Sequence, residues 1–311
     1  MINRLRNVLP VLALVLATAF WGSSFFTVGR TLDSTNPYML LVLRFGAATL
    51  LVVPMLGARL FRIPASTWRA GAICGTVICG GYLFNTMGLV TLESSVSGFI
   101  TALYVPFTPL LMWLFYSKAP KPSSILGVLV AFAGMVILAG PFSGEWKDSY
   151  EGELITLGSA LLSAVEILLV GRYAPHCEPR EFAFTQLISV TFYSLAIWVL
   201  LNAAGVPMKE TVFDSTLFTG ILWLAVIVAF VQVLLGWGQK TVAPDHAAII
   251  FSMESVFAAV IGYIAGERLG INGFVGGGLI VAAVFISELK CVERGLDSLL
   301  ARLRRGLLRG R

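Results

Sequence analysis

Long runs of apolar residues, separated by short polar stretches, occupy almost the whole chain. Each run is about 20 residues long, the length at which a helix crosses a hydrocarbon layer of about 30 Å. The pattern predicts membrane-spanning helices over residues 8–28, 37–57, 69–91, 94–117, 123–141, 153–172, 182–204, 216–239, 246–265 and 271–289. The fold class that we expect is an all-α membrane protein of ten transmembrane helices.

The composition agrees with a chain that lies mostly in lipid. Of the 311 residues, 57% are hydrophobic and 13% are charged, against about 25% charged residues in a soluble domain. The connections between the predicted spans are short and contain no soluble domain. We therefore expect the function to lie within the membrane.

Most of the 22 Lys and Arg residues fall in alternate connections, such as Arg59, Arg62 and Arg69, and near the end of the chain. Because positive residues favour the cytoplasmic side, we predict a multi-pass protein of the bacterial inner (plasma) membrane with both termini cytoplasmic. In residues 291–311, leucines and arginines interleave, which predicts an amphipathic helix on anionic lipid. Anionic lipid accounts for the basic balance, and no nucleic acid is expected as a partner.

The two halves of the chain match at fixed offsets. Pro37 matches Pro179 at an offset of 142 residues, and Gly88 matches Gly238 at an offset of 150. The other matched pairs are Val28 with Val170, Gly29 with Gly171, Arg30 with Arg172, Arg44 with Gln186, Thr91 with Thr241, Ile100 with Ile250, Phe107 with Phe257 and Gly127 with Gly277. The constant offsets indicate a duplication.

A repeat of five spans, an odd number, must sit upside down relative to its first copy. We therefore predict two inverted-topology five-helix repeats. The predicted domains are residues 1–143 and 150–290, followed by the cytoplasmic basic amphipathic tail 291–311.

Short motifs of the chain resemble the EamA-type members of the drug/metabolite transporter superfamily. These motifs are Phe20-Trp21-Gly22-Ser23-Ser24, Arg44-Phe45, Pro106 with Pro109, and Gly266-Glu267-Arg268-Leu269. The resemblance covers nearly the whole chain. It implies a ten-helix inverted-repeat fold, with spans one to four and six to nine around a central cavity, and export of small metabolites such as amino acids. The chain departs from the family at Ser117, which matches Glu267 and stands where such families often have an acidic residue.

Three ionisable residues, Arg44, Glu166 and Glu254, fall near the middle of apolar spans. A charge in hydrocarbon is unfavourable unless it faces a cavity or a partner. We predict that these residues bind the substrate, Arg44 through the carboxylate of an amino acid and a glutamate through its ammonium. A carboxylate held away from water can also exchange a proton, so Glu166 and Glu254 are proton-coupling candidates. Alternatively, the three residues pair with one another or with backbone carbonyls and lock helices together.

Aromatic and amide side chains complete the candidate binding site. They are Trp21, Tyr82, Asn85, Tyr104, Gln186 and Gln232. Aromatic faces with a polar edge suit an amphiphilic solute, although each of these residues can also serve only to pack or bridge helices. Pro106 and Pro109 predict a bent or broken fourth span, which acts either as a hinge or as a static kink.

Other function classes lack their residues. The two histidines and four cysteines show no metal-ligand spacing, so we expect no metal, no cofactor and no enzymatic activity. A primary pump needs a GxxxxGK[ST] loop, which is missing from the sequence. The GxxxG spacing of Gly71 and Gly75 favours close helix packing and leaves a homodimer open.

The function that we predict is a secondary transporter that exports small metabolites, amino acids or related amphiphilic compounds, by alternating access. One alternative is a nucleotide-sugar or phosphorylated-metabolite antiporter, which needs several cations where the spans offer only Arg44. Another alternative is a passive channel, because hydropathy does not distinguish a pore from a carrier.

Overall fold

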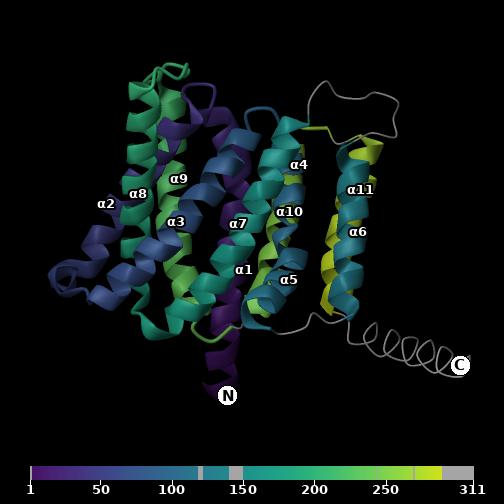
Figure 1. Ribbon diagram of the computed structural model, residues 1–311, viewed down its shortest axis with the longest axis horizontal. Helices are drawn as coiled ribbons and strands as arrows, with labels where there is room; N and C mark the ends of the chain where they lie inside the picture. Colours follow the sequence, from purple (N-terminus) through teal and green to yellow (C-terminus); the bar gives the residue numbers. More distant parts are fainter. Residues whose placement is uncertain (1, 118–121, 140–149, 243, 269, 289–311) are drawn as a thin grey trace, which may run out of the picture.

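The chain folds as a bundle of helices packed side by side (Figure 1). The computed structural model describes residues 2–117, 122–139, 150–242, 244–268 and 270–288. Within these ranges there is no strand. This is the outcome expected in lipid, where a helix satisfies its own backbone hydrogen bonds. The predicted tail helix, 291–311, lies outside the described residues.

The described elements follow one another along the chain without a long connection. The helices of the first half are α1 (Ile2–Thr31), α2 (Pro37–Leu56), η1 (Gly57–Arg62), α3 (Ala65–Gly88), α4 (Ser94–Thr101), α5 (Tyr104–Tyr116) and α6 (Pro122–Ala139). The helices of the second half are α7 (Glu151–Tyr173), η3 (Ala174–His176), α8 (Pro179–Ala203), α9 (Ser215–Gly238), α10 (Pro244–Ile264) and α11 (Ile271–Glu288).

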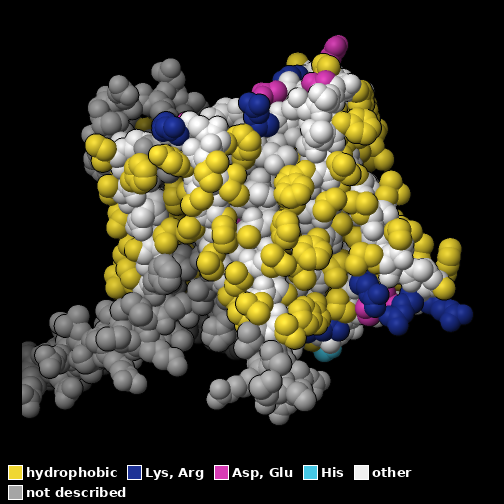
Figure 2. Space-filling view, turned by 180° about the vertical axis from the view of Figure 1, so that it is seen from behind, with side chains coloured by type: hydrophobic (Ala, Val, Ile, Leu, Met, Phe, Trp, Pro, Cys, Tyr) yellow, Lys and Arg dark blue, Asp and Glu magenta, His cyan; other side chains and the backbone are white. Residues whose placement is uncertain are grey.

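The described helices make this a multi-pass membrane protein. Seven helical segments are long and apolar enough to cross a membrane, and three shorter apolar helices fall in the fifth, ninth and tenth predicted spans. A belt of hydrophobic side chains covers the surface between the charged ends of the molecule (Figure 2). Leu200, Phe218 and Phe274 are 68%, 73% and 64% exposed, which places them where lipid chains would contact them.

The fourth predicted span is interrupted and does not form one helix. α4 ends at Thr101 and α5 begins at Tyr104. The N–H of Val105 donates to the carbonyl of Ala102 at 3.1 Å, three residues back instead of four. Since Pro106 has no N–H, it cannot donate to that carbonyl. Our expectation of a continuous 94–117 helix was wrong by this break, which precedes Pro106.

Pro109 lies inside α5. The interruption is therefore at residues 102–103 and not at either proline. A hinge role of Pro106 and Pro109 stays a prediction.

The helices pack in pairs that map onto one another when the two halves are exchanged. α1 packs against α9 and α10, and its counterpart α7 packs against α3 and α5. Likewise α3 packs against α8, and α9 packs against α2. The two remaining large contacts, α2 with α8 and α6 with α11, join a helix to its own counterpart. The packing therefore follows the five-helix unit found in the sequence.

Individual contacts on the α2–α8 pair repeat at the offset of 142 residues. Thr49 and Thr191, which are 142 residues apart, meet with 3.2 Å between their hydroxyl oxygens. Each also donates to the carbonyl four residues earlier, Thr49 to Phe45 and Thr191 to Leu187, both at 2.8 Å. Equivalent residues that touch each other lie on an axis of pseudo-symmetry.

A second pair of contacts lies away from this axis. Gly88 of α3 packs against Thr156 of α7, and Gly238 of α9 packs against Leu14 of α1. Leu14 and Thr156 differ by 142 residues, and Gly88 and Gly238 by 150. The offsets read from the sequence thus relate contacts in space as well.

The glycines of the GxxxG pattern are used within the chain. A Cβ on Gly71 would meet Thr185, and a Cβ on Gly75 would meet Ser189 at 2.7 Å. α3 and α8 therefore cross closely at this point. The possible homodimer stays a prediction.

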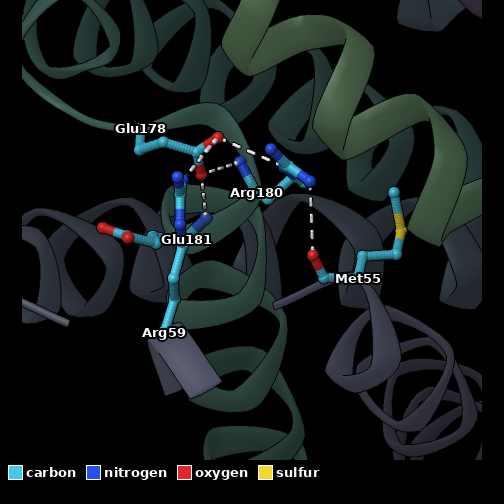
Figure 3. A network of polar contacts seen from close by, with 5 residues as sticks. All are labelled: Met55, Arg59, Glu178, Arg180 and Glu181. Atoms are coloured by element: carbon cyan, nitrogen blue, oxygen red, sulfur yellow. Dashed lines mark hydrogen bonds and ion pairs between the residues drawn. The ribbon is translucent and has the colours of Figure 1, made fainter. Parts of the chain in front are cut away.

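The bundle has two ends, which we call the N-terminal end, where α1 begins, and the far end, where α1 stops (Figure 1). At the N-terminal end, Glu178 accepts from the N–H groups of Arg180 and Glu181 at 2.9 and 3.0 Å and pairs with the Arg180 guanidinium at 3.2 Å (Figure 3). Arg180 also donates to the carbonyl of Met55, and Arg59 lies 4.0 Å from Glu178. This network ties the start of α8 to the end of α2.

At the far end, the connection between α8 and α9 is strapped to the connection between α1 and α2. The Lys209 ammonium donates to the carbonyls of Leu32 and Asp33 at 3.0 and 2.7 Å. The Ser34 hydroxyl donates to Asp214 at 2.8 Å. Asp214 also caps α9. These contacts join the first and second halves outside the spans.

Replacing Asp214 with alanine is expected to lower the temperature of unfolding in detergent, because the mutation removes the N-cap of α9. The N–H of Leu217 and the hydroxyl of Ser34 hold the pKa of Asp214 below its ordinary value. The contribution of the carboxylate is therefore present at neutral pH and is lost as the pH falls through that lowered pKa. Asp214→Asn, whose amide oxygen also caps, is the control. Equal unfolding temperatures for the alanine variant and the wild type would contradict the assignment.

Candidate functional site

A cavity between the two halves brings together seven of the nine predicted binding residues. It contains about 680 Å³ of empty space, a size suited to a small molecule. The predicted residues on its wall are Trp21, Arg44, Tyr82, Asn85, Tyr104, Glu166 and Glu254.

Gln186 and Gln232 are buried behind the cavity wall and do not line it. Gln186 lies beside Cys74, and Gln232 lies beside Glu166. Among the described residues, α8 contributes none to the wall, nor do α6 and α11. The seventh span, expected to border the cavity, therefore supports it from outside.

Three aromatic rings form one side of the cavity. The indole N–H of Trp21 donates to the Tyr82 hydroxyl at 2.7 Å. Trp21 also meets Phe251 edge to face, with the ring centres 5.6 Å apart. The Arg44 guanidinium lies over the Tyr82 ring at 4.7 Å, in the range of a cation–π contact. The aromatic side of the cavity therefore carries a positive charge.

Arg44 is buried but not neutralised by an ion pair. Its side chain comes from α2 and is 2% exposed. Among the described residues it makes no ion pair, and its Nε and Nη2 atoms have no hydrogen-bond partner in the protein. A guanidinium presents five donors, so Arg44 has donors available for a ligand. The alternative role, locking helices through a salt bridge, has no support in these contacts.

Two carboxylates face the same cavity from the second half. Glu166 of α7 and Glu254 of α10 are 8% and 9% exposed. The Oε1 atom of Glu166 has no hydrogen-bond partner in the protein, and the Tyr104 hydroxyl lies beside Glu254. The cavity thus holds one cation and two carboxylates in an apolar surrounding, where charge attraction is much stronger than in water.

Asn85 of α3 joins the cavity wall to α4. Its amide donates to the hydroxyls of Thr101 at 3.1 Å and of Ser97 at 3.5 Å. Thr101, the last residue of α4, also lines the cavity. The interruption of the fourth span therefore faces the site.

Most of the wall consists of residues that are equivalent in the two halves. Twelve of its eighteen residues form pairs at the offsets of 142 or 150. These pairs are Trp21 with Ser163, Ser24 with Glu166, Phe25 with Ile167, Asn85 with Leu235, Thr101 with Phe251 and Tyr104 with Glu254. The cavity therefore lies on the axis that relates the halves.

The equivalent positions differ in chemistry. Ser24 and Tyr104 of the first half correspond to Glu166 and Glu254 of the second, and Arg44 corresponds to Gln186. The first half supplies the cation, and the second half supplies both carboxylates. A site that the duplication makes symmetric in shape is therefore polarised in charge.

Some wall residues were missed in the sequence, although helical spacing could have found them. Ser159 and Ser163 precede Glu166 by seven and three residues, so they share one face of α7. Phe251 precedes Glu254 by three residues in the same way. Ser159 is fixed by a 2.8 Å hydrogen bond to the carbonyl of Gly81.

Gln239, at the end of α9, lines the cavity with a buried side-chain oxygen that has no partner. No sequence pattern distinguished it, since it lies at a helix end. Among the described residues, no three His, Cys, Asp or Glu side chains gather in a way that could hold a metal ion.

The chain is similar to known transporters over nearly all its length. The profile of a family described as "EamA-like transporter family" matches residues 8–140 and again 151–289. An uncharacterized transporter of Archaeoglobus fulgidus is 32% identical over 283 residues, covering 90% of this chain and 85% of that protein. A second uncharacterized transporter of the same organism is 22% identical, covering 88% of this chain and 97% of the relative.

The fold is also found among solved structures. A protein crystal structure superposes with a TM-score of 0.67 at 17% identity, covering 94% of this chain and 99% of that chain. At this identity the match shows the fold alone, and it agrees with the drug/metabolite transporter fold that the sequence motifs resemble.

Gly22→Ala is expected to destabilise the protein by about 1–3 kcal/mol, the usual effect of overpacking. A Cβ there would stand 2.5 Å from the Phe257 Cβ and 2.9 Å from the Glu254 carbonyl, so α1 and α10 would have to separate beside Trp21. Gly278→Ala, where a Cβ meets nothing within 4 Å, is the control. Thermal unfolding of both variants in detergent makes the comparison, and equal effects would contradict the close crossing.

Proposed function

Because the chain belongs to the EamA-like transporter family, we propose that it is a secondary transporter that exports small zwitterionic metabolites of the amino-acid type. The family is one of transporters, which supports a transport role and not an enzymatic one. The substrate would bind in the cavity between the halves. Transport would proceed by alternating access.

The observation that carries the substrate class is the polarised cavity. Arg44 has unpartnered donors beside Tyr82, and Glu166 and Glu254 face it from the second half. An amino acid carries a carboxylate that suits the guanidinium and an ammonium that suits a carboxylate. Its side chain would lie against the aromatic rings.

We further propose that the two halves, 1–143 and 150–290, are inverted-topology five-helix repeats with both termini cytoplasmic. α1 runs from the N-terminal end to the far end, and α7 runs in the opposite direction (Figure 1). The exchangeable packing of the halves supports the inversion. An inverted pair gives two related conformations, in which either end of the site opens.

The orientation rests on the charges of the described residues. Basic residues gather at the N-terminal end, and acidic residues outnumber basic ones at the far end. The basic residues of the N-terminal end are Arg59, Arg62, Arg69, Arg172, Arg180 and Lys240, and the acidic residues of the far end are Asp33, Glu93, Glu151, Glu153, Glu210, Asp214 and Glu267. Positive residues favour the cytoplasm, so the far end would face outward from a bacterial inner membrane.

The alternative substrates fit the site less well. A nucleotide sugar or phosphorylated metabolite carries two or more negative charges. Arg44 is the one Lys or Arg among the described wall residues, and Glu166 and Glu254 would repel a phosphate. A passive channel stays an alternative that transport measurements can separate.

Counterflow in proteoliposomes tests the transport mechanism. We expect an unlabelled amino acid inside the vesicles to accelerate the uptake of the labelled compound, because a loaded carrier exchanges in both directions. A panel of labelled amino acids, with and without a pH gradient, identifies the substrate and any proton coupling. Uptake without acceleration would support a channel and contradict the carrier.

Arg44→Ala is expected to reduce transport about tenfold or more while the protein still folds, because a hydrogen bond to a charged group contributes about 1.5–3 kcal/mol. Uptake and thermal unfolding are measured on the same preparation. Arg69→Ala, on the exposed surface of α3, is the matched control. Loss of folded Arg44→Ala protein would instead assign Arg44 to helix packing.

Glu166→Gln and Glu254→Gln separate the two carboxylates. If either residue carries the coupled proton, its amide variant should transport at a rate that depends less on the pH gradient. If either binds the substrate ammonium, its variant should raise the KM. Both variants transporting at the wild-type rate and pH dependence would remove the carboxylates from the mechanism.

A further inference from the structure

The turn after α10 is bound to the start of α4 by one carboxylate. Glu267 accepts hydrogen bonds from the backbone N–H groups of Ser94 and Ser95 at 3.0 and 3.1 Å, and from the Ser95 hydroxyl at 2.5 Å. Its own N–H donates to the carbonyl of Gly262 at 2.9 Å. A negative charge at the first turn of a helix is favourable, because unpaired N–H groups and the positive end of the helix dipole meet there.

α4 transmits its position to the cavity. It has eight residues and ends at the interruption of the fourth span. Its Ser97 and Thr101 accept from Asn85 of the cavity wall. Gly98 of α4 packs directly against Ala258 of α10, where a Cβ would come within 2.8 Å. The place of α4 against α10 therefore determines how the wall closes at the far end.

From these contacts we propose that Glu267 is the positioning residue that latches the far end of the transporter closed. It belongs to the second half, and its partners Ser94 and Ser95 belong to the first. Opening the cavity at the far end separates α4 from the end of α10 and breaks all three hydrogen bonds. The latch rests on the alternating access proposed above.

The N-terminal end cannot form the same latch, although the halves are duplicated. The residue equivalent to Glu267 is Ser117, which has no carboxylate. The residues equivalent to Ser94 and Ser95 are Pro244, which has no N–H, and Asp245, which is negatively charged. One end is therefore fastened and the other is not.

The asymmetry biases the empty transporter toward the conformation that is closed at the far end. In the orientation proposed above, that conformation opens to the cytoplasm. An exporter takes up its substrate there, so the latch favours loading from the correct side. The bias equals the free energy of the latch, because a contact made in one conformation alone shifts the population toward it.

Labelling of a single cysteine tests the latch without any substrate. The four cysteines are replaced by alanine, and Ser163→Cys on the cavity wall reports access from outside to a membrane-impermeant maleimide. Glu267→Ala should raise the labelling rate about tenfold, the ratio typical of a lost hydrogen bond to a charged group. Glu267→Gln should give a smaller rise, because its amide oxygen still accepts.

A transport measurement gives a second readout that a purely structural role would not produce. Glu267→Ala should lower the KM for substrate added outside and raise the KM for substrate added inside, since it shifts one equilibrium. Glu210→Ala removes an exposed carboxylate from the same end and should leave the labelling rate and both KM values unchanged.

Unchanged labelling in folded Glu267→Ala and Glu267→Gln would overturn the latch, and so would an equal rise in Glu210→Ala. If Glu267→Ala does not fold, Glu267→Gln together with Ser95→Ala supplies the same comparison, with the same result expected and the same result excluded. Altered labelling without measurable amino-acid transport would keep the latch and reject the proposed substrate.

Discussion

An ionised side chain in hydrocarbon must face a cavity or a partner, and this constraint organises the molecule. Arg44, Glu166 and Glu254 each lie in an otherwise apolar span, and all three face one cavity. Helices satisfy their own backbone groups in lipid, so the remaining polar side chains decide where the bundle has to stay open. The site and the fold therefore have the same physical cause.

Duplication supplies the shape of the site, and divergence supplies its chemistry. Thr49 and Thr191 meet as equivalents between α2 and α8, and the cavity wall is built largely from equivalent pairs. A symmetric pair of halves would present the same groups to both sides of a bound molecule. Here the first half presents the guanidinium of Arg44 and the second half two carboxylates, so a molecule with two different ends is favoured.

The sequence predicted the spans and the main groups of the cavity wall, because both follow from hydrophobicity. It did not predict which polar residues stand behind the wall, such as Gln186 and Gln232, since helix rotation depends on packing between helices. The break before Pro106 was displaced from the expected position, because it depends on which carbonyl loses its donor. The contact of Glu267 with α4 joins residues 172 and 173 positions apart, and no local pattern encodes such a pair.

The central claim is that one polarised cavity is reached from either side of the membrane in turn. The most direct test labels Ser163→Cys, in the cysteine-free protein, with an impermeant maleimide added to one side at a time. The account predicts labelling from each side, protection by a saturating transported amino acid, and no passage of the reagent across the membrane. Labelling from one side only, or labelling that the amino acid does not affect, would contradict it.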